Sequence, residues 1–347
     1  FEVNRETKVL ASVVKRMTER RDYLLAHHNK LTIDGDVHPS DIDALPEDVL
    51  ARIQTDPNYY QGRPLLSDGL LARLEMAGID MAACWQNPAV LPYGDDEAQN
   101  AKKLRGANER IAKLADRHPT RVIPAGWTDP KALGVDRAVE LAQYCVEELA
   151  MPVVKMNPAQ NAYPIDSDMV FQVVDAIVAT GAVPAFHFGA DTQYTPTEGL
   201  VRVAKRHPDH PVIAVHMGGG GAHFVEAEET YQTARAAGLE NPNIFYPLSA
   251  KRDAHIESDL ITYAKAGAPF CNNIAIATDA PYCDPVWTMG GFRSLIKALA
   301  DGDSYPDPRI QAKPDLFDAD MIQGIMGSNY AKLIIAAYDR ILSIGAR

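Results

Sequence analysis

Eight short apolar runs, separated by helix-like segments, constrain the fold of this chain more than any other feature. From the third run on, they recur about every 30 residues, the length of one strand–helix unit. The runs are LTIDGDV (31–37), MAACW (81–85), RVIPAG (121–126), PVVKM (152–156), AVPAFHF (182–188), PVIAVHM (211–217), NIFYP (243–247) and NIAIATD (273–279). This order predicts an α/β fold of the (β/α)8 TIM-barrel type rather than an open sheet.

Helix-like segments fill the intervals between the runs. The segment DGLLARLEMAG (68–78) begins with an acid and ends with a glycine, as helix capping favours. Further helices are expected at 95–119, 135–149, 166–181, 196–208, 221–238 and 253–267, with two closing helices at 318–327 and 328–342.

Two units are expected, an N-terminal helical extension over 1–30 and the barrel over 31–347. The first 30 residues read as a charged amphipathic helix and lack the apolar core of a signal peptide. Residues 39–67, rich in Pro, Asp and Tyr, form a long insertion after the first strand, for which we expect a lid or an oligomer contact. Residues 301–315 are expected to form an exposed loop.

Charge and cysteine content limit the partners. The net charge of −12 argues against nucleic acid and anionic membranes, and no apolar run reaches the roughly 18 residues that span a bilayer. The four cysteines show no disulfide or zinc spacing and indicate a reduced, cytoplasmic protein. We expect a small-molecule substrate and a homo- or hetero-oligomer.

The glycine pattern disfavours two kinds of nucleotide-binding site. No G-x-G-x-x-G follows the first run, which disfavours a dinucleotide site. The stretch GGGG (218–221) follows the sixth run, but no Walker lysine and serine come after it.

Polar residues at the ends of the runs indicate a metal site. Residues two apart on a strand point to one side, so Asp36 and His38 in LTIDGDVHPS either grip a cation together or close a turn. The active site of such a barrel lies at the carboxyl ends of its strands. The other polar residues expected at this mouth are Lys155, His187, His216 and Asp279.

Each of these residues, taken alone, could have a purely structural role, because a strand histidine is often a hydrogen-bonded core residue and an aspartate often belongs to a turn. Asp191 and His223 are interpreted in this way, as loop and cap residues. Ligand-type side chains at the same end of several strands favour the metal site.

These motifs carry a resemblance to a known family. The order IDGDVH, FHFGAD, VHMGGG, IATDAPY and IMGSNYAKLI, over about residues 31–341, resembles the amidohydrolase superfamily. It looks most like the branch of aminocarboxymuconate-semialdehyde decarboxylase and the resorcylate-type decarboxylases. The resemblance implies that Asp36, His38, His187 and Asp279 bind a metal, and that His216 is the acid–base group or a further ligand.

Asp36 departs from the His-x-His that this family carries on its first strand. A set with two carboxylates accepts Mn²⁺ or Fe²⁺ as well as Zn²⁺, and it lowers the pKa of a bound water less than a three-histidine set. We expect a divalent metal, Zn²⁺ first, and one ion rather than two. Asn329 of the final motif is expected to be structural.

The substrate contacts are less sharply indicated. Lys155 either binds a substrate carboxylate, or is carboxylated and bridges two metals as in other branches of the superfamily, or lies off the mouth; we favour substrate binding. Arg252 is a candidate carboxylate clamp, with a helix cap or a surface ion pair as the alternative. Candidate pocket walls, with a packing role as the alternative, are Tyr59, Tyr60, Trp85, Trp127, Tyr194 and Tyr282.

Three functions are compatible with these residues. The leading hypothesis is a metal-dependent hydrolase or decarboxylase that acts on a small carboxylated substrate, with His216 and Asp279 as catalytic residues. The second is a dinuclear-metal hydroxylase that activates O₂. The third is a metal-bearing, non-catalytic subunit of a larger assembly.

Overall fold

A computed structural model describes residues 2–345 except 42, 44, 57, 58, 63, 89, 90, 190–192 and 220–227. Strands coincide with all eight apolar runs, and the third run is split in two at Ala125. The strands are β1 (Ile33–Val37), β2 (Met81–Cys84), β3 (Val122–Pro124), β4 (Gly126–Trp127), β5 (Val153–Met156), β6 (Val183–His187), β7 (Val212–Val215), β8 (Ile244–Leu248) and β9 (Ile274–Ile276).

All strand pairs are parallel, and their order follows the sequence. One sheet has the order β1-β2-β3 and the other runs from β4 to β9. The break at Ala125 is bridged because its N–H donates to the carbonyl of Cys84 at 3.0 Å. A parallel bridge between Val37 and Ala280 connects the end of β1 to the segment after β9. The last strand therefore lies beside the first, as a barrel requires.

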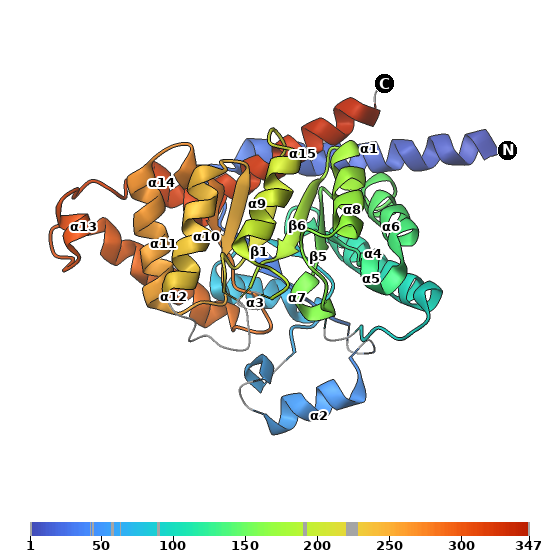
Figure 1. Ribbon diagram of the computed structural model, residues 1–347, viewed down its shortest axis with the longest axis horizontal. Helices are drawn as coiled ribbons and strands as arrows, with labels where there is room; N and C mark the ends of the chain where they lie inside the picture. Colours follow the sequence, from blue (N-terminus) through green and yellow to red (C-terminus); the bar gives the residue numbers. More distant parts are fainter. Residues whose placement is uncertain are drawn as a thin grey trace.

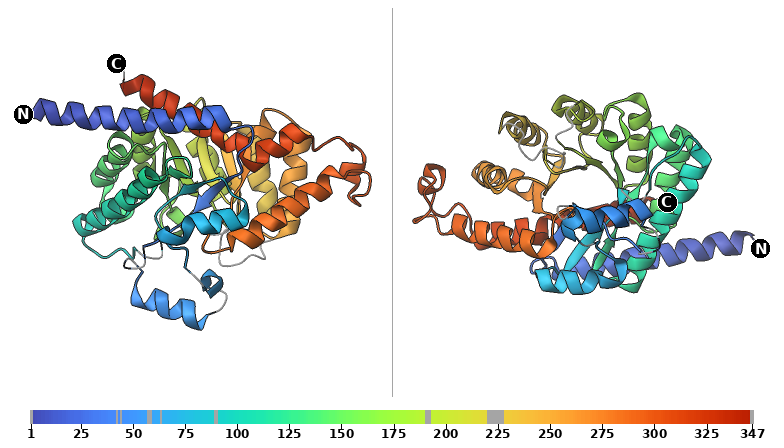
Figure 2. Two further views of the ribbon diagram at one scale, coloured as in Figure 1. Left: turned by 180° about the vertical axis from the view of Figure 1, so that it is seen from behind. Right: turned by 90° about the horizontal axis from the view of Figure 1, so that it is seen from below.

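Helices surround the strands, as the view from below in Figure 2 shows. They are α1 (Glu2–His27), α2 (Glu47–Thr55), α3 (Leu70–Ala77), α4 (Glu97–Arg117), α5 (Pro130–Leu133), α6 (Val135–Glu147), α7 (Pro158–Asn161), α8 (Asp168–Ala179), α9 (Thr197–Arg206), α10 (Glu228–Glu240), α11 (Asp253–Ala266), α12 (Pro285–Ala300), α13 (Pro308–Gln311), α14 (Ala319–Gln323) and α15 (Asn329–Gly345). None of the helices in the described part of the chain is long and apolar enough to cross a membrane.

The two ends of the barrel differ in what covers them. Helices α1 and α15 lie across the amino-terminal ends of the strands, whereas α2 projects beyond the carboxyl ends (Figure 1). Within the insertion, Leu45, Val49, Ile53 and Tyr60 form a small apolar cluster separate from the main core. The insertion is thus a packed element on the side of the barrel where active sites lie.

The carboxyl-terminal third contains two helices that the sequence pattern does not reveal. The first, α12, occupies Pro285–Ala300. Its Asp284–Pro285 start is a capping signal, since the Asp284 carboxylate accepts from two backbone N–H groups, but the Gly290–Gly291 pair hides the helical pattern. The stretch 301–315 is mostly exposed, as expected, but it also contains the short helix α13, whose Ile310 is buried.

Candidate metal centre

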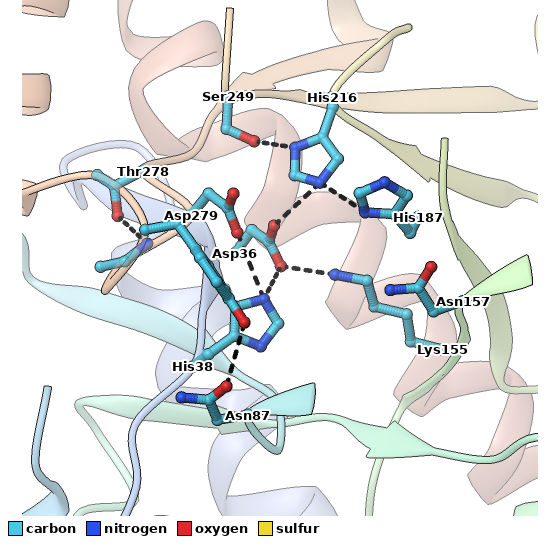
Figure 3. A network of polar contacts seen from close by, with 12 residues as sticks. Asp36, His38, Asn87, Lys155, Asn157, His187, His216, Ser249, Thr278 and Asp279 are labelled. Atoms are coloured by element: carbon cyan, nitrogen blue, oxygen red, sulfur yellow. Dashed lines mark hydrogen bonds and ion pairs between the residues drawn. The ribbon is translucent and has the colours of Figure 1, made fainter. Parts of the chain in front are cut away.

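Six of the residues expected at the barrel mouth meet in one cluster (Figure 3). Five of them are buried and His187 is half-buried. β1 supplies the first carboxylate, β5 the lysine and β6 a histidine, while the other three follow the ends of β1, β7 and β9. The cluster consists of Asp36, His38, Lys155, His187, His216 and Asp279.

Distances within the cluster suit a shared cation. His38 Nε2 lies 3.3 Å from Asp36 Oδ1 and 3.5 Å from Asp279 Oδ1. His216 Nε2 lies 4.0 Å from Asp36 Oδ2. Ligand atoms about 2.1 Å from one ion are about 3.0–3.5 Å from each other at tetrahedral or octahedral angles. The polar atoms are therefore almost as close together as a bound ion requires.

One oxygen at the centre of the cluster lacks a partner. Asp36 Oδ2 is buried and has no hydrogen-bond partner among the described residues. A buried carboxylate oxygen in this state is costly unless it contacts a cation or a donor. Ligand atoms of Asp36, His216 and Asp279 all lie within 4.8 Å of one another. The residues present thus fit a divalent metal ion.

This three-residue group differs from the expected ligand set in its histidine. It contains His216, which we expect to be the acid–base group or an additional ligand, rather than His38 or His187. His187 Nδ1 lies 3.1 Å from His216 Nε2, so the two rings are hydrogen-bonded neighbours, and it is His216 whose Nε2 lies 4.0 Å from Asp36. The division of roles between these two histidines stays a prediction.

Lys155 lies inside the cluster, so the alternative that it lies off the mouth is wrong. Its Nζ donates to Asp36 Oδ1 at 2.9 Å, and the side chain is 1% exposed. The ammonium also lies 4.9 Å from the ring centre of Trp85 and 5.3 Å from that of Trp127. Two indole faces and a carboxylate are good surroundings for a buried cation.

Different groups hold the rings of His38 and His216. His38 Nδ1 is 2.9 Å from the main-chain carbonyl of Gln86. A carbonyl only accepts, so this contact places a proton on Nδ1 and turns Nε2 toward the two carboxylates. His216 Nδ1 is 2.8 Å from the hydroxyl of Ser249, which can donate or accept.

Charges in the cluster shift the pKa values in opposite directions. Burial alone would raise the pKa of Asp36, but Lys155 and His38 lower it well below its ordinary value. Burial opposes protonation of His38, yet the Asp36 charge raises the pKa of His38 to about 9. Burial raises the pKa of Asp279 to about 6. The site thus keeps Asp36 ionised and attracts positive charge to it.

The other two rings are held neutral. Burial, followed by the Lys155 charge, lowers the pKa of His187 to about 3. Burial, followed by His187, lowers the pKa of His216 well below its ordinary value. Neutral imidazoles are the form that binds metals.

Asp34 lies beside the cluster but is not among the residues expected at the mouth. It is buried on β1 and accepts from the N–H of Thr278 at 2.9 Å and from the N–H of Asp36 at 3.2 Å. The Thr278 hydroxyl also donates to it. Asp34 therefore connects the strands that carry Asp36 and Asp279. Its spacing of two residues from Asp36 on the same strand is the signal that could have revealed it.

An aromatic wall joins the insertion to the centre. Tyr60 of the insertion packs edge-on against Tyr282, and Tyr282 packs edge-on against His38. Both tyrosine hydroxyls donate to Asn87 Oδ1, at 3.1 and 3.2 Å. Tyr60 and Tyr282 thus line this side of the centre, while Trp85 and Trp127 flank Lys155.

The remaining candidates lie elsewhere. Arg252 is exposed and occupies the N-cap position of α11, where its side chain makes no capping hydrogen bond, so its role stays a prediction. Asp191 and His223 lie outside the described residues. Asn329 is buried and its side-chain amide donates to the carbonyls of Cys271 and Ile274, a structural role.

Comparison with known proteins agrees with this architecture. The amidohydrolase family matches residues 33–329, most of the chain. An uncharacterized TIM-barrel protein from Bordetella bronchiseptica superposes with a TM-score of 0.59 at 18% identity, over 91% of this chain and 99% of that one. No curated protein matches the sequence significantly.

Two decarboxylases share the fold. 5-Carboxyvanillate decarboxylase from Sphingomonas paucimobilis has a TM-score of 0.60 at 16% identity, over 88% of this chain and 98% of that one. A dihydroxybenzoic acid decarboxylase from Polaromonas, solved with manganese and 2-nitroresorcinol, has a TM-score of 0.58 at 15% identity, over 87% and 96%. At such identities the likeness concerns the fold. The match over residues 33–329 and the shared barrel establish that this chain belongs to the amidohydrolase family.

Proposed function

We propose that this protein is a metal-dependent decarboxylase that acts on a small carboxylated substrate. The observation that carries the proposal is the unpartnered Asp36 Oδ2 at the centre of a buried group of imidazoles and carboxylates. Asp36, His38, His187 and Asp279 would hold the ion, with Zn²⁺ or Mn²⁺ as the leading candidates and Fe²⁺ as an alternative. The ion supplies Lewis-acid polarisation of a substrate oxygen.

The charge of the site favours a carboxylated substrate. With the imidazoles neutral, as metal binding requires, ionised Asp36 and Asp279 and the Lys155 ammonium give the side chains a charge of −1, and a divalent ion would bring the site to +1. A substrate carboxylate neutralises this charge in a region that excludes most water. The Lys155 ammonium beside Asp36 supports this electrostatic role.

The same contact argues against a carboxylated Lys155. Carboxylation would replace the ammonium by an anion facing the Asp36 carboxylate, and like charges at this distance repel. We therefore expect Lys155→Met to leave metal stoichiometry unchanged while lowering turnover. Loss of a second metal equivalent in this variant would show instead that the lysine bridges two ions.

Decarboxylation also needs a proton for the carbon that loses CO₂. The C–C bond breaks, CO₂ leaves, and the carbon takes up one proton. His216 lies outside the proposed ligand set and has the Ser249 hydroxyl behind its ring. It is therefore our candidate for the group that passes on this proton, while Asp279 would act as an ionised ligand of the ion.

The test measures the metal content of the purified protein and CO₂ release from a panel of small carboxylic acids, with O₂ uptake followed in parallel. We expect about one divalent ion per chain, its loss in Asp36→Asn, and CO₂ release without O₂ uptake. Substrate-dependent O₂ uptake with iron would favour the hydroxylase instead. Full metal content in both Asp36→Asn and Asp279→Asn would reject the proposed centre.

A further inference from the structure

The backbone that carries His216 is unusually constrained. His216, Met217 and Gly218 follow β7 with φ angles of 79°, 45° and 85°. Only glycine adopts this left-handed region readily, so two consecutive non-glycine residues there are disfavoured. Such a conformation persists where neighbouring groups enforce it.

The segment after β8 supplies these groups. The Ser249 hydroxyl contacts His216 Nδ1 at 2.8 Å, as Figure 3 shows. Two residues on, Lys251 Nζ donates to the main-chain carbonyl of Met217 at 3.2 Å. One segment therefore holds both the ring of His216 and the peptide that follows it.

Lys251 is itself held in place from behind. Its side chain is fully buried, and its ammonium pairs with Asp259 of α11. The other Asp259 oxygen pairs with Arg235 of α10 at 2.5 Å. The two helices thus fix the ammonium, and the ammonium fixes the Met217 carbonyl.

Close packing leaves the loop little freedom to move. A side chain at Gly219 would overlap with Lys251 Cγ and lie 2.7 Å from the Ala250 carbonyl. The loop after β7 consequently fits against the Ser249–Lys251 segment only because residue 219 has no side chain.

We propose that Ser249 and Lys251 are positioning residues that hold the His216 ring beside Asp36. Ser249 sets the orientation of the ring through Nδ1, and Lys251 stabilises the left-handed backbone through the Met217 carbonyl. This inference extends the proposed function, since it assigns residues that act on the centre through His216. Polar groups behind a metal-binding or acid–base imidazole typically change affinity or activity about 10–100-fold when removed.

The test uses the full-length protein and two variants. Ser249→Ala removes the hydroxyl, and Lys251→Met removes the donor while leaving the Arg235–Asp259 pair balanced. In metal-free protein with ¹⁵N-labelled histidine, we expect changed ring nitrogen shifts for His216 in both variants. With Mn²⁺ alone as the probe, we expect affinity to change little in either variant, because the proposed ligand set does not include His216. CO₂ release should fall about 10–100-fold in Ser249→Ala and less in Lys251→Met.

Two controls separate positioning from general damage. Ser249→Thr keeps the hydroxyl and should restore the His216 shifts. Lys265→Met, on the exposed face of the same helix α11, should leave them unchanged. His216 shifts in Ser249→Ala and Lys251→Met identical to those of the wild type would overturn the inference. If the wild type binds no Mn²⁺, the proposed function fails while the nitrogen shifts still decide this inference.

Discussion

The two sides of the metal centre are built from different hydrogen-bond partners. On the β1–β2 side, a main-chain carbonyl holds His38, and the Lys155 ammonium holds Asp36. On the β7–β8 side, a hydroxyl holds His216, whose backbone is left-handed. A carbonyl fixes one proton position, whereas a hydroxyl accepts either tautomer. The first side is suited to holding a cation, and the second to moving a proton.

The largest effect is expected for Asp36→Asn, which removes the charge that both sides face. Metal affinity should fall about 100-fold or more, since a central anionic ligand is lost. The Lys155 ammonium would also stay buried without its counter-ion, which we expect to destabilise the metal-free protein by about 3 kcal/mol. Metal analysis and chemical denaturation measure the two effects. If Asp36→Asn kept both the metal affinity and the stability of the wild type, Asp36 would not be part of the metal centre.

A direct comparison of the two sides uses His38→Asn and His216→Asn. We expect His38→Asn to lower metal affinity about 10–100-fold, and His216→Asn to retain most of the metal while turnover falls about 100-fold or more. Mn²⁺ titration and CO₂ release report the two quantities. His210→Asn is the matched control, because His210 Nε2 contacts the Ala182 carbonyl away from the centre. Equal loss of metal in both variants would show that the two sides share one role.

The alkaline stability of the metal-free protein tests the first side. The folded-state pKa of His38 is about 9, above its ordinary value of 6.5, because Asp36 and Asp279 stabilise the charged ring. The folded state therefore binds the additional proton between these values. The charged His38 ring therefore contributes fully to the free energy of unfolding below pH 6.5, and this contribution is lost as the pH rises through 9. Over this range the free energy of unfolding should fall by at most about 1.4 kcal/mol per pH unit.

Denaturation between about pH 6 and 9.5 measures this slope, with EDTA removed before the titration. His38→Asn should have a flatter profile over that range, while His210→Asn should follow the wild type. A steep profile in His38→Asn would assign the alkaline loss to another group.

The smallest effect is expected for Arg252→Ala. The side chain is exposed at the start of α11, and exposed substitutions change stability by about 0.5 kcal/mol or less. We expect kcat/KM for the best substrate to change less than about threefold. A rise in KM of about tenfold or more would show that Arg252 reaches the substrate, as a carboxylate clamp must.

Much of the barrel could be predicted because its strands are short apolar runs at regular spacing. All eight runs contain strands, and the residues expected at the mouth do meet. Helix α12 could not be found in the same way, because a glycine pair interrupts its periodicity. The residues that hold His216 and its backbone were not predicted either. Ser249 and Lys251 follow β8 as polar residues, but a serine and a lysine carry no ligand signal by themselves.

The sequence by itself determined the order of strands and helices, the residue types at the strand ends and the family. Those features depend on periodicity and on motifs that are local in the chain. Only the tertiary structure decided that Lys155 faces Asp36, that a carbonyl holds His38, and that a hydroxyl holds His216. These contacts join segments about 30–120 residues apart, and their geometry depends on how the barrel places side chains from different strands, which no local pattern encodes.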